Sequence, residues 1–197
     1  MISTGIILAA GASSRMGQPK ALLLFEGETF LDRLSGVLES RCAEVIAVTG
    51  YHAQAIQAGL RRQQRLVTNP HPEKGQLSSL QCGLRALPDP AEAFLFVPVD
   101  YPAVRRETVE RLVDALEAAP SALLAIPRFE GRHGHPVACR RRIARELLAL
   151  GGEDSARDVV RRHKPATIYV DVADAGVVTD VDDPEAYRRL LAMAEHS

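Results

Sequence analysis

Paired or clustered cysteines are missing from this sequence. The 197 residues include three cysteines, Cys42, Cys82 and Cys139, which lie far apart and form no CxxC or Cys/His spacing. Neither a zinc site nor a disulfide framework is therefore expected. We expect reduced thiols of a cytoplasmic protein, because free cysteine behaves as a small buried hydrophobe.

An excess of charge and long apolar runs are also missing. The 24 basic and 25 acidic residues leave a net charge of −1. This balance argues against a broad face for nucleic acid or membrane, although a local basic pocket for a small anion remains open. The apolar stretch near the N-terminus is short, is interrupted by Gly5 and has no preceding lysine or arginine. We therefore predict no signal peptide, no membrane span and no nucleic-acid partner.

The composition is that of an ordinary globular protein, with 46% hydrophobic and 25% charged residues. A chain of this length can bury a full core without disulfides or metals. There is no internal repeat, so one domain over residues 1–197 is expected. A monomer is also expected, because no long apolar stripe is left over.

Short apolar segments alternate along the chain with segments of helical period. This alternation predicts an α/β fold, a three-layer α/β/α arrangement around a mostly parallel, Rossmann-like sheet. Residues 128–139 are rich in glycine and histidine and predict a hairpin or loop. The expected strands cover residues 6–8, 44–49, 66–68, 94–99, 123–126 and 167–172. One helix is expected to begin near Thr29. Further helices are expected over residues 52–64, 77–87, 106–119, 142–150, 155–163 and 184–194.

The loop LAAGASSRMGQPK, from Leu8 to Lys20, follows the first buried strand. Its small residues let a ligand approach the backbone, and its N–H groups can bind phosphate oxygens. It is neither a Walker A motif nor GxGxxG, because five residues separate Gly11 from Gly17 and Lys20 is not adjacent to Gly17. Arg15 suits bidentate phosphate binding and Lys20 suits a point of growing charge. The alternative is a solvated loop with two incidental cations.

Carboxylates stand at two further places where chemistry is expected. Asp100 ends the most apolar strand, where it can bind Mg²⁺ or form a turn that caps the next helix. In such sheets ligands lie beyond the carboxyl ends of the strands. Asp180, Asp182 and Asp183 precede the last helix, and Asp183, directly before Pro184, is the expected cap.

Three other segments have two interpretations each. The hydroxyls of Ser78 and Ser79 at a helix start suit a nucleotide or an ordinary cap. His135 can be a structural histidine packed on Pro136 or part of a substrate site. The arginine run 140–142 can attract a phosphorylated substrate, although a solvated helix start is favoured.

The loop sequence closely resembles the LAAGxSxRMGxxK signature of the MobA-like nucleotidyltransferases. Within them it is most similar to the molybdenum cofactor cytidylyltransferases. Further matching segments follow in the same order over nearly the whole chain. They are Asn69-Pro70 with KGQLSSL at residues 74–80, PVDYP at 98–102, GHPV at 134–137 and TDVDDPEAY at 179–187.

This resemblance implies roles for individual residues. Arg15 would hold the triphosphate, Lys20 would stabilise the α-phosphate, and Asp100 with Asp182, or with Asp180 in its place, would bind Mg²⁺. Many relatives carry methionine where Gln76 stands, so the resemblance implies no role for the Gln76 side chain. The remaining implied nucleotide-binding residues are Leu8, Ala9, Ala10, Gly11, Ala12, Asn69, Gly75, Ser78 and Ser79. The implied acceptor-binding residues are Gly134, His135 and Pro136, with Arg132 and His133 beside them.

The resemblance also implies a reaction, the transfer of CMP from CTP to the terminal phosphate of molybdopterin with release of pyrophosphate. Guanylyl-transferring relatives usually read LAGG, so the methyl group of Ala10 favours a pyrimidine base. GTP, or a sugar or polyol phosphate as acceptor, are the alternatives within this fold. A non-catalytic module that hands cofactor to a partner is the alternative of another class. The expected downstream partner is a molybdoenzyme or its chaperone.

Overall fold

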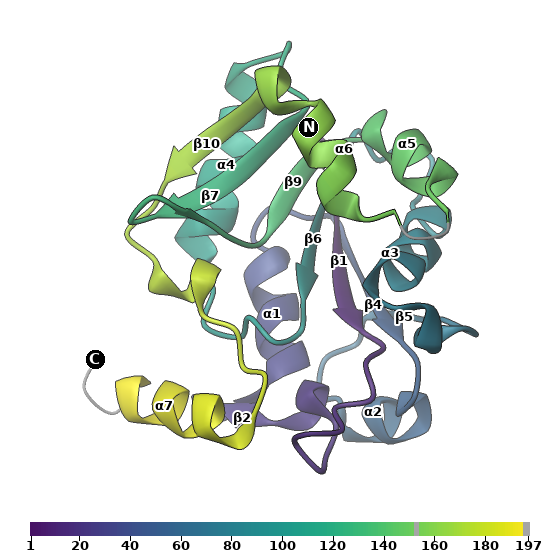
Figure 1. The fold of residues 1–197 in the computed structure, drawn as a ribbon, viewed down its shortest axis with the longest axis vertical. Helices are drawn as coiled ribbons and strands as arrows, with labels where there is room; N and C mark the ends of the chain where they lie inside the picture. Colours follow the sequence, from purple (N-terminus) through teal and green to yellow (C-terminus); the bar gives the residue numbers. More distant parts are fainter. Residues whose placement is uncertain (152–153, 195–197) are drawn as a thin grey trace.

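A central sheet organises the computed structural model, which describes residues 1–151 and 154–194 (Figure 1). Its strand order is β10-β7-β9-β6-β1-β4-β5, and β8 pairs with β7. A separate antiparallel pair joins β2 and β3. The strands are β1 Ser3–Ala9, β2 Leu24–Phe25, β3 Glu28–Thr29, β4 Glu44–Thr49, β5 Arg65–Thr68, β6 Ala93–Pro98, β7 Leu124–Phe129, β8 Arg132–His133, β9 Val137–Arg140 and β10 Thr167–Asp171.

The sheet is mostly parallel, as predicted. β1 pairs in parallel with β4 and β6, β4 with β5, and β7 with β10. The predicted hairpin at residues 128–139 forms between β7 and β8. It is followed by a strand that the sequence did not predict, β9, which enters between β6 and β7 antiparallel to both. With four residues, β9 is too short for a periodicity signal.

Helices cover both faces of the sheet, which confirms the three-layer arrangement. Side chains alternate along β1, with Ile7 and Ala9 in one core and Ile6 and Leu8 in the other. The first core packs against α1 and α4, and the second against α3, α5 and α6. The helices are α1 Phe30–Leu38, α2 Ala53–Gly59, α3 Gln76–Arg85, α4 Arg106–Ala118, α5 Ile143–Ala149, α6 Ala156–Arg162 and α7 Pro184–Ala194. Short 3₁₀ turns cover Lys20–Leu22, Pro72–Lys74, Lys164–Ala166 and Ala175–Val178.

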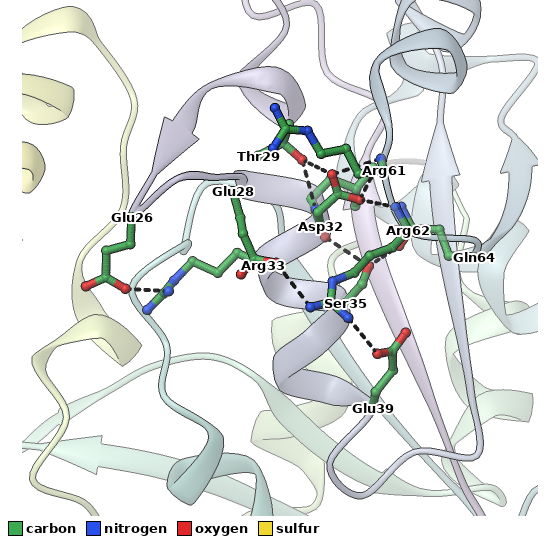
Figure 2. A network of polar contacts seen from close by, with 11 residues as sticks. Glu26, Glu28, Thr29, Asp32, Arg33, Ser35, Glu39, Arg61, Arg62 and Gln64 are labelled. Atoms are coloured by element: carbon green, nitrogen blue, oxygen red, sulfur yellow. Dashed lines mark hydrogen bonds and ion pairs between the residues drawn. The ribbon is translucent and has the colours of Figure 1, made fainter.

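Helix α2 is shorter than predicted, because it ends at Gly59 and not near residue 64. The chain that follows is bound by the carboxylate of Asp32 on α1, which is buried with 1% of its surface exposed. This carboxylate accepts the backbone N–H groups of Arg61 (3.1 Å) and Arg62 (3.0 Å), and the hydroxyl of Thr29 (Figure 2). These N–H groups therefore donate to Asp32 and not to carbonyl groups of a continuing helix. The local sequence pattern could not predict this tertiary contact.

We expect Asp32→Ala to lower the free energy of unfolding by about 2–4 kcal/mol, because it leaves two part-buried backbone N–H groups without their acceptor. Urea unfolding followed by circular dichroism measures this loss. Asp114→Ala is the matched control, since the exposed Asp114 side chain forms an ion pair with Arg41. Its loss should stay below about 1 kcal/mol. Equal losses in the two variants would contradict this account of Asp32.

Within the described residues, no helix has the length and apolarity that a membrane crossing needs.

Candidate active site

The carboxyl edge of the sheet brings the loops after four strands together. In the register of the sheet, Ala9 of β1 lies beside Thr49 of β4, and Leu8 lies beside Pro98 of β6. Thr49 in turn lies beside Thr68 of β5. Since β1 has β4 on one side and β6 on the other, this edge contains the switch point at which ligands bind in such sheets.

A pocket of about 320 Å³ opens at this edge. Many residues that the resemblance assigns to the nucleotide or to Mg²⁺ line it. They are Leu8, Ala9, Ala10, Gly11, Arg15, Lys20, Gly75, Ser79, Asp100 and Asp182. The structure therefore brings together residues that are up to 174 positions apart in the sequence, from Leu8 to Asp182.

The loop between β1 and Lys20 is held by two contacts. The Ser13 hydroxyl accepts the backbone N–H of Lys20 at 3.0 Å, and the Ser13 carbonyl accepts the N–H of Met16 at 2.9 Å. The ring of His52, which follows β4, lies 2.9 Å from the carbonyl oxygen of Ala12. Sequence reasoning missed Ser13 and His52 as pocket residues. The position of His52 just after a strand end was the only available signal.

Lys20 lies between two carboxylates. Its Nζ is 2.7 Å from Oδ1 of Asp182 and 3.5 Å from Oδ2 of Asp100. Arg15 lies farther out, with its Nη1 3.8 Å from Oδ2 of Asp182. The exposed fraction of the side chain is 14% for Lys20 and 24% for Asp100, but 51% for Asp182 and 72% for Arg15. Lys20 and Asp100 thus form the floor of the site, and Arg15 and Asp182 lie at its mouth.

Asp100 has an oxygen with unused binding capacity. Its Oδ1 is buried and has no hydrogen-bond partner among the described residues. Burial raises the pKa of Asp100 above its usual value, the charge of Lys20 acts in the opposite direction, and the charges of Asp182 and Asp180 raise it further. Such a carboxylate gains from a cation at Oδ1.

The described residues contain no group of three or more histidine, cysteine, aspartate or glutamate side chains that could hold a metal ion. Asp100 and Asp182 are two oxygen donors on one pocket. This set fits Mg²⁺, which is commonly bound by one or two carboxylates together with substrate phosphates and water. Asp180 does not line the pocket. Asp183 accepts the backbone N–H of Ala186 at 2.8 Å, which confirms it as the cap of α7.

Asn69 and Ser78 lie behind the wall of the pocket. The Asn69 amide donates to the hydroxyls of Ser78 (2.8 Å) and Ser79 (3.0 Å), and its oxygen accepts the N–H of His71 (2.9 Å). These contacts shape the turn that presents Gly75 and Ser79 to the pocket. Direct nucleotide contacts of Asn69, Ser78 and the exposed Ala12 stay predictions.

The Gly134-His135-Pro136 segment does not line this pocket. The His135 ring packs 4.9 Å from the Tyr101 ring and 5.9 Å from the Phe96 ring, and its Nδ1 has no partner among the described residues. Burial lowers the pKa of His135 to about 4, so the ring is neutral at pH 7. At Gly134 a side chain is excluded, because a Cβ would lie 2.0 Å from the carbonyl oxygen of Val177.

Within the arginine run 140–142, only Arg142 matches the solvated helix start that the sequence favoured, because it is exposed directly before α5. Arg140 ends β9 and donates to the carbonyl of Leu116, at 2.6 Å. Arg141 donates to the carbonyl of Ala91, at 3.1 Å. Both side chains therefore satisfy carbonyl groups of neighbouring loops and helix ends, and a helical pattern cannot predict contacts so distant in the sequence.

Comparisons with known proteins agree with this geometry. The family model for the MobA-like NTP transferase domain matches residues 5–167. A protein from Paenarthrobacter nicotinovorans named nicotine blue oxidoreductase is 33% identical, over 95% of this chain and 96% of its own length. A probable molybdenum cofactor guanylyltransferase from Pelotomaculum thermopropionicum is 35% identical over 68% of this chain and 61% of its own length.

Solved structures extend the similarity over nearly the whole fold. The crystal structure of Rv0371c from Mycobacterium tuberculosis has a TM-score of 0.83 and 30% identity, with 98% of each chain covered. A complex of Rv0371c with manganese has a TM-score of 0.77 and 27% identity, covering 98% of this chain and 99% of the other. The family model, the matching fold and the pocket around Lys20 lead to one conclusion: this chain belongs to the MobA-like NTP transferase domain family, a family of nucleotidyltransferases.

Proposed function

We propose that this protein transfers CMP from CTP to the terminal phosphate of a molybdopterin-type acceptor and releases pyrophosphate. The observation that carries the proposal is the position of Lys20 between Asp100 and Asp182, on the floor of a pocket framed by the LAAG loop. Cations and carboxylates at one point suit a reaction in which negative charge grows on a phosphate.

Each charged residue has a separate task in this reaction. Arg15, at the mouth, binds the outer phosphates of the nucleotide. Lys20, on the floor, stabilises the α-phosphate as its bond to the acceptor oxygen forms and the bond to pyrophosphate breaks. Asp100 and Asp182 would hold Mg²⁺, which would supply charge neutralisation for the phosphates. The attacking phosphate is already ionised near pH 7, so no general base is required. Positioning does most of the remaining work.

The acceptor is proposed from relatives. Several of them are named molybdenum cofactor guanylyltransferase or probable molybdenum cofactor guanylyltransferase. Their names favour GTP, whereas the sequence of the loop favours CTP. The support for CTP is Ala10, which lines the pocket at a position where guanylyl-transferring relatives usually carry glycine.

We expect Ala10→Gly to raise kcat/KM for GTP relative to CTP by about tenfold, since one methyl group in a pocket discriminates by roughly that factor or more. Steady-state kinetics with both nucleotides measure the ratio. UTP is the internal control. Because uracil and cytosine are similar in size, the order of kcat/KM for UTP and CTP should stay the same in the variant. An unchanged GTP/CTP ratio would remove Ala10 from the account of nucleotide choice.

The test of the function is pyrophosphate release with Mg²⁺ and molybdenum-loaded molybdopterin, comparing CTP, GTP, ATP and UTP. Release with CTP alone is the expected result, and Asp100→Asn should lower its rate by about 10²- to 10³-fold. Release with GTP would keep the mechanism and reject the assigned nucleotide. Release only with a sugar or polyol phosphate would reject the assigned acceptor. Nucleotide binding without release for any acceptor would indicate a carrier module.

An oxidoreductase activity is the second candidate, favoured by the relative named nicotine blue oxidoreductase, which aligns over 96% of its own length. A redox reaction needs an electron donor, for which a reduced nicotinamide dinucleotide is the candidate. Tight binding of NADH or NADPH, with their oxidation by a dye such as an indophenol, would favour this candidate. Tight binding of CTP with Mg²⁺ and no binding of either dinucleotide would exclude it.

A further inference from the structure

A second pocket, of about 380 Å³, adjoins the first and is not explained by nucleotide binding. It lies where α3, β6 and the start of α6 meet, and it shares Leu8 and Gln76 with the nucleotide pocket. A ligand in the second pocket would therefore lie directly beside a nucleotide in the first.

The second pocket combines an apolar wall with two cations. Leu77, Leu80 and the ring of Phe96 form the wall, and Lys74 and Arg157 add positive charge. Asp154 also lines the pocket, so its net charge is one positive, and the Asp154 carboxylate is engaged by the backbone N–H of Gly151 at 3.2 Å. Within residues 1–151 and 154–194, neither Lys74 nor Arg157 pairs with a carboxylate. Within this part of the chain, their charges are therefore not neutralised by an ion pair.

The position of Arg157 connects this pocket to the expected acceptor segment. The Phe96 ring, on the pocket wall, packs against His135. The charge of Arg157 acts on His135, whose pKa it lowers after the larger effect of burial, and on the neighbouring Tyr101. His135 is neutral and enclosed, so it cannot supply the positive charge that an anionic acceptor needs. Arg157 and Lys74 can.

We propose that the second pocket binds the acceptor of the transfer reaction, a flat heterocycle that carries anionic groups. The ring system packs on Phe96, Leu77 and Leu80, while Arg157 and Lys74 bind the anionic groups. Lys74 directly precedes Gly75 of the nucleotide pocket, so an acceptor phosphate bound there is directed toward the α-phosphate. This inference rests on the proposed function. It places the acceptor in the second pocket and not on the Gly134-His135-Pro136 segment.

The test compares Arg157→Ala and Lys74→Ala with Arg161→Ala. Arg161 is the matched control, because it lies on the same helix α6, is exposed and forms an ion pair with Asp158, at 3.6 Å. In pyrophosphate release we expect the acceptor KM to rise about 10- to 100-fold in the first two variants, the effect of losing one charge-assisted hydrogen bond. The KM for CTP should stay unchanged in all three. Equal acceptor KM values in Arg157→Ala and Arg161→Ala would overturn the proposal.

A binding measurement separates this inference from the proposed function. The probe is pterin-6-carboxylate, a fluorescent flat heterocycle with one anionic group, titrated by anisotropy against the full chain. Binding that is weakened at least tenfold by Arg157→Ala, unaffected by Arg161→Ala and retained in saturating CTP would support the second pocket, even if the protein releases no pyrophosphate. No binding, or displacement of the probe by CTP, would overturn the inference and leave the proposed function to its own test.

Discussion

Replacing Asp100 with asparagine should lower kcat for pyrophosphate release by about 10²- to 10³-fold, or about 3–4 kcal/mol of transition-state stabilisation. The substitution keeps the shape of the side chain and removes its charge. Asp100 is the less exposed of the two carboxylates beside Lys20, and its Oδ1 has no partner among the described residues. The substitution therefore removes the charge of the carboxylate that is best placed to hold Mg²⁺.

Two readouts separate a metal role of Asp100 from a role in folding. The variant should bind CTP without Mg²⁺ as well as the unmodified protein does, and Mg²⁺ should no longer strengthen that binding. Thermal unfolding should show an intact fold. Asp89→Asn, which alters an exposed aspartate, should leave both kcat and the Mg²⁺ response unchanged. Wild-type kcat in Asp100→Asn would show that this carboxylate does not hold the metal.

Lys20→Met should have an effect of similar size, lowering kcat by about 10²- to 10³-fold. Methionine keeps the length of the side chain and removes the ammonium group. The loss has two sources: the α-phosphate loses its charge partner, and Asp100 and Asp182 lose the cation between them. Like charges that face one another without a cation disfavour the binding of a further anion such as CTP.

The Mg²⁺ dependence of Lys20→Met distinguishes these two sources. If the lysine serves mainly to neutralise the carboxylates, high Mg²⁺ restores most of kcat. If it stabilises the transferring phosphate, as proposed, kcat stays low at every Mg²⁺ concentration. Lys164→Met, which alters a surface lysine, should retain the activity of the unmodified protein. Full kcat in Lys20→Met at ordinary Mg²⁺ would contradict the role given to Lys20.

The order of strands and helices could be predicted because local pattern carries it. Short continuous apolar runs mark β1, β4 and β6. The Thr29 cap marks the start of α1, where the Thr29 hydroxyl accepts the N–H of Asp32. The antiparallel strand β9 and the early end of α2 could not be predicted. Their causes are tertiary, namely pairing with β6 and β7 and the binding of residues 61 and 62 by Asp32.

In the site, too, some residues could be predicted from the sequence and others could not. The loop residues Arg15 and Lys20 and the strand-end Asp100 could be found from their positions, because parallel strands end at one edge. Asp182 depended on the resemblance, since an acidic residue before a helix is usually a cap. The contact of the His52 ring with the Ala12 carbonyl could not be predicted, nor could the position of Arg157 and Phe96 on one pocket, because no local spacing encodes either.

The central claim is that the α-phosphate of the nucleotide moves to the acceptor. The most direct test uses CTP labelled with ³²P at either the α- or the γ-phosphate and measures which product carries the label. With Mg²⁺ and molybdenum-loaded molybdopterin, the account predicts that α-label appears in the acceptor product and γ-label appears in pyrophosphate. Transfer of γ-label to the acceptor would identify a kinase, and no transfer of either label from protein that binds CTP and the acceptor would contradict nucleotidyl transfer.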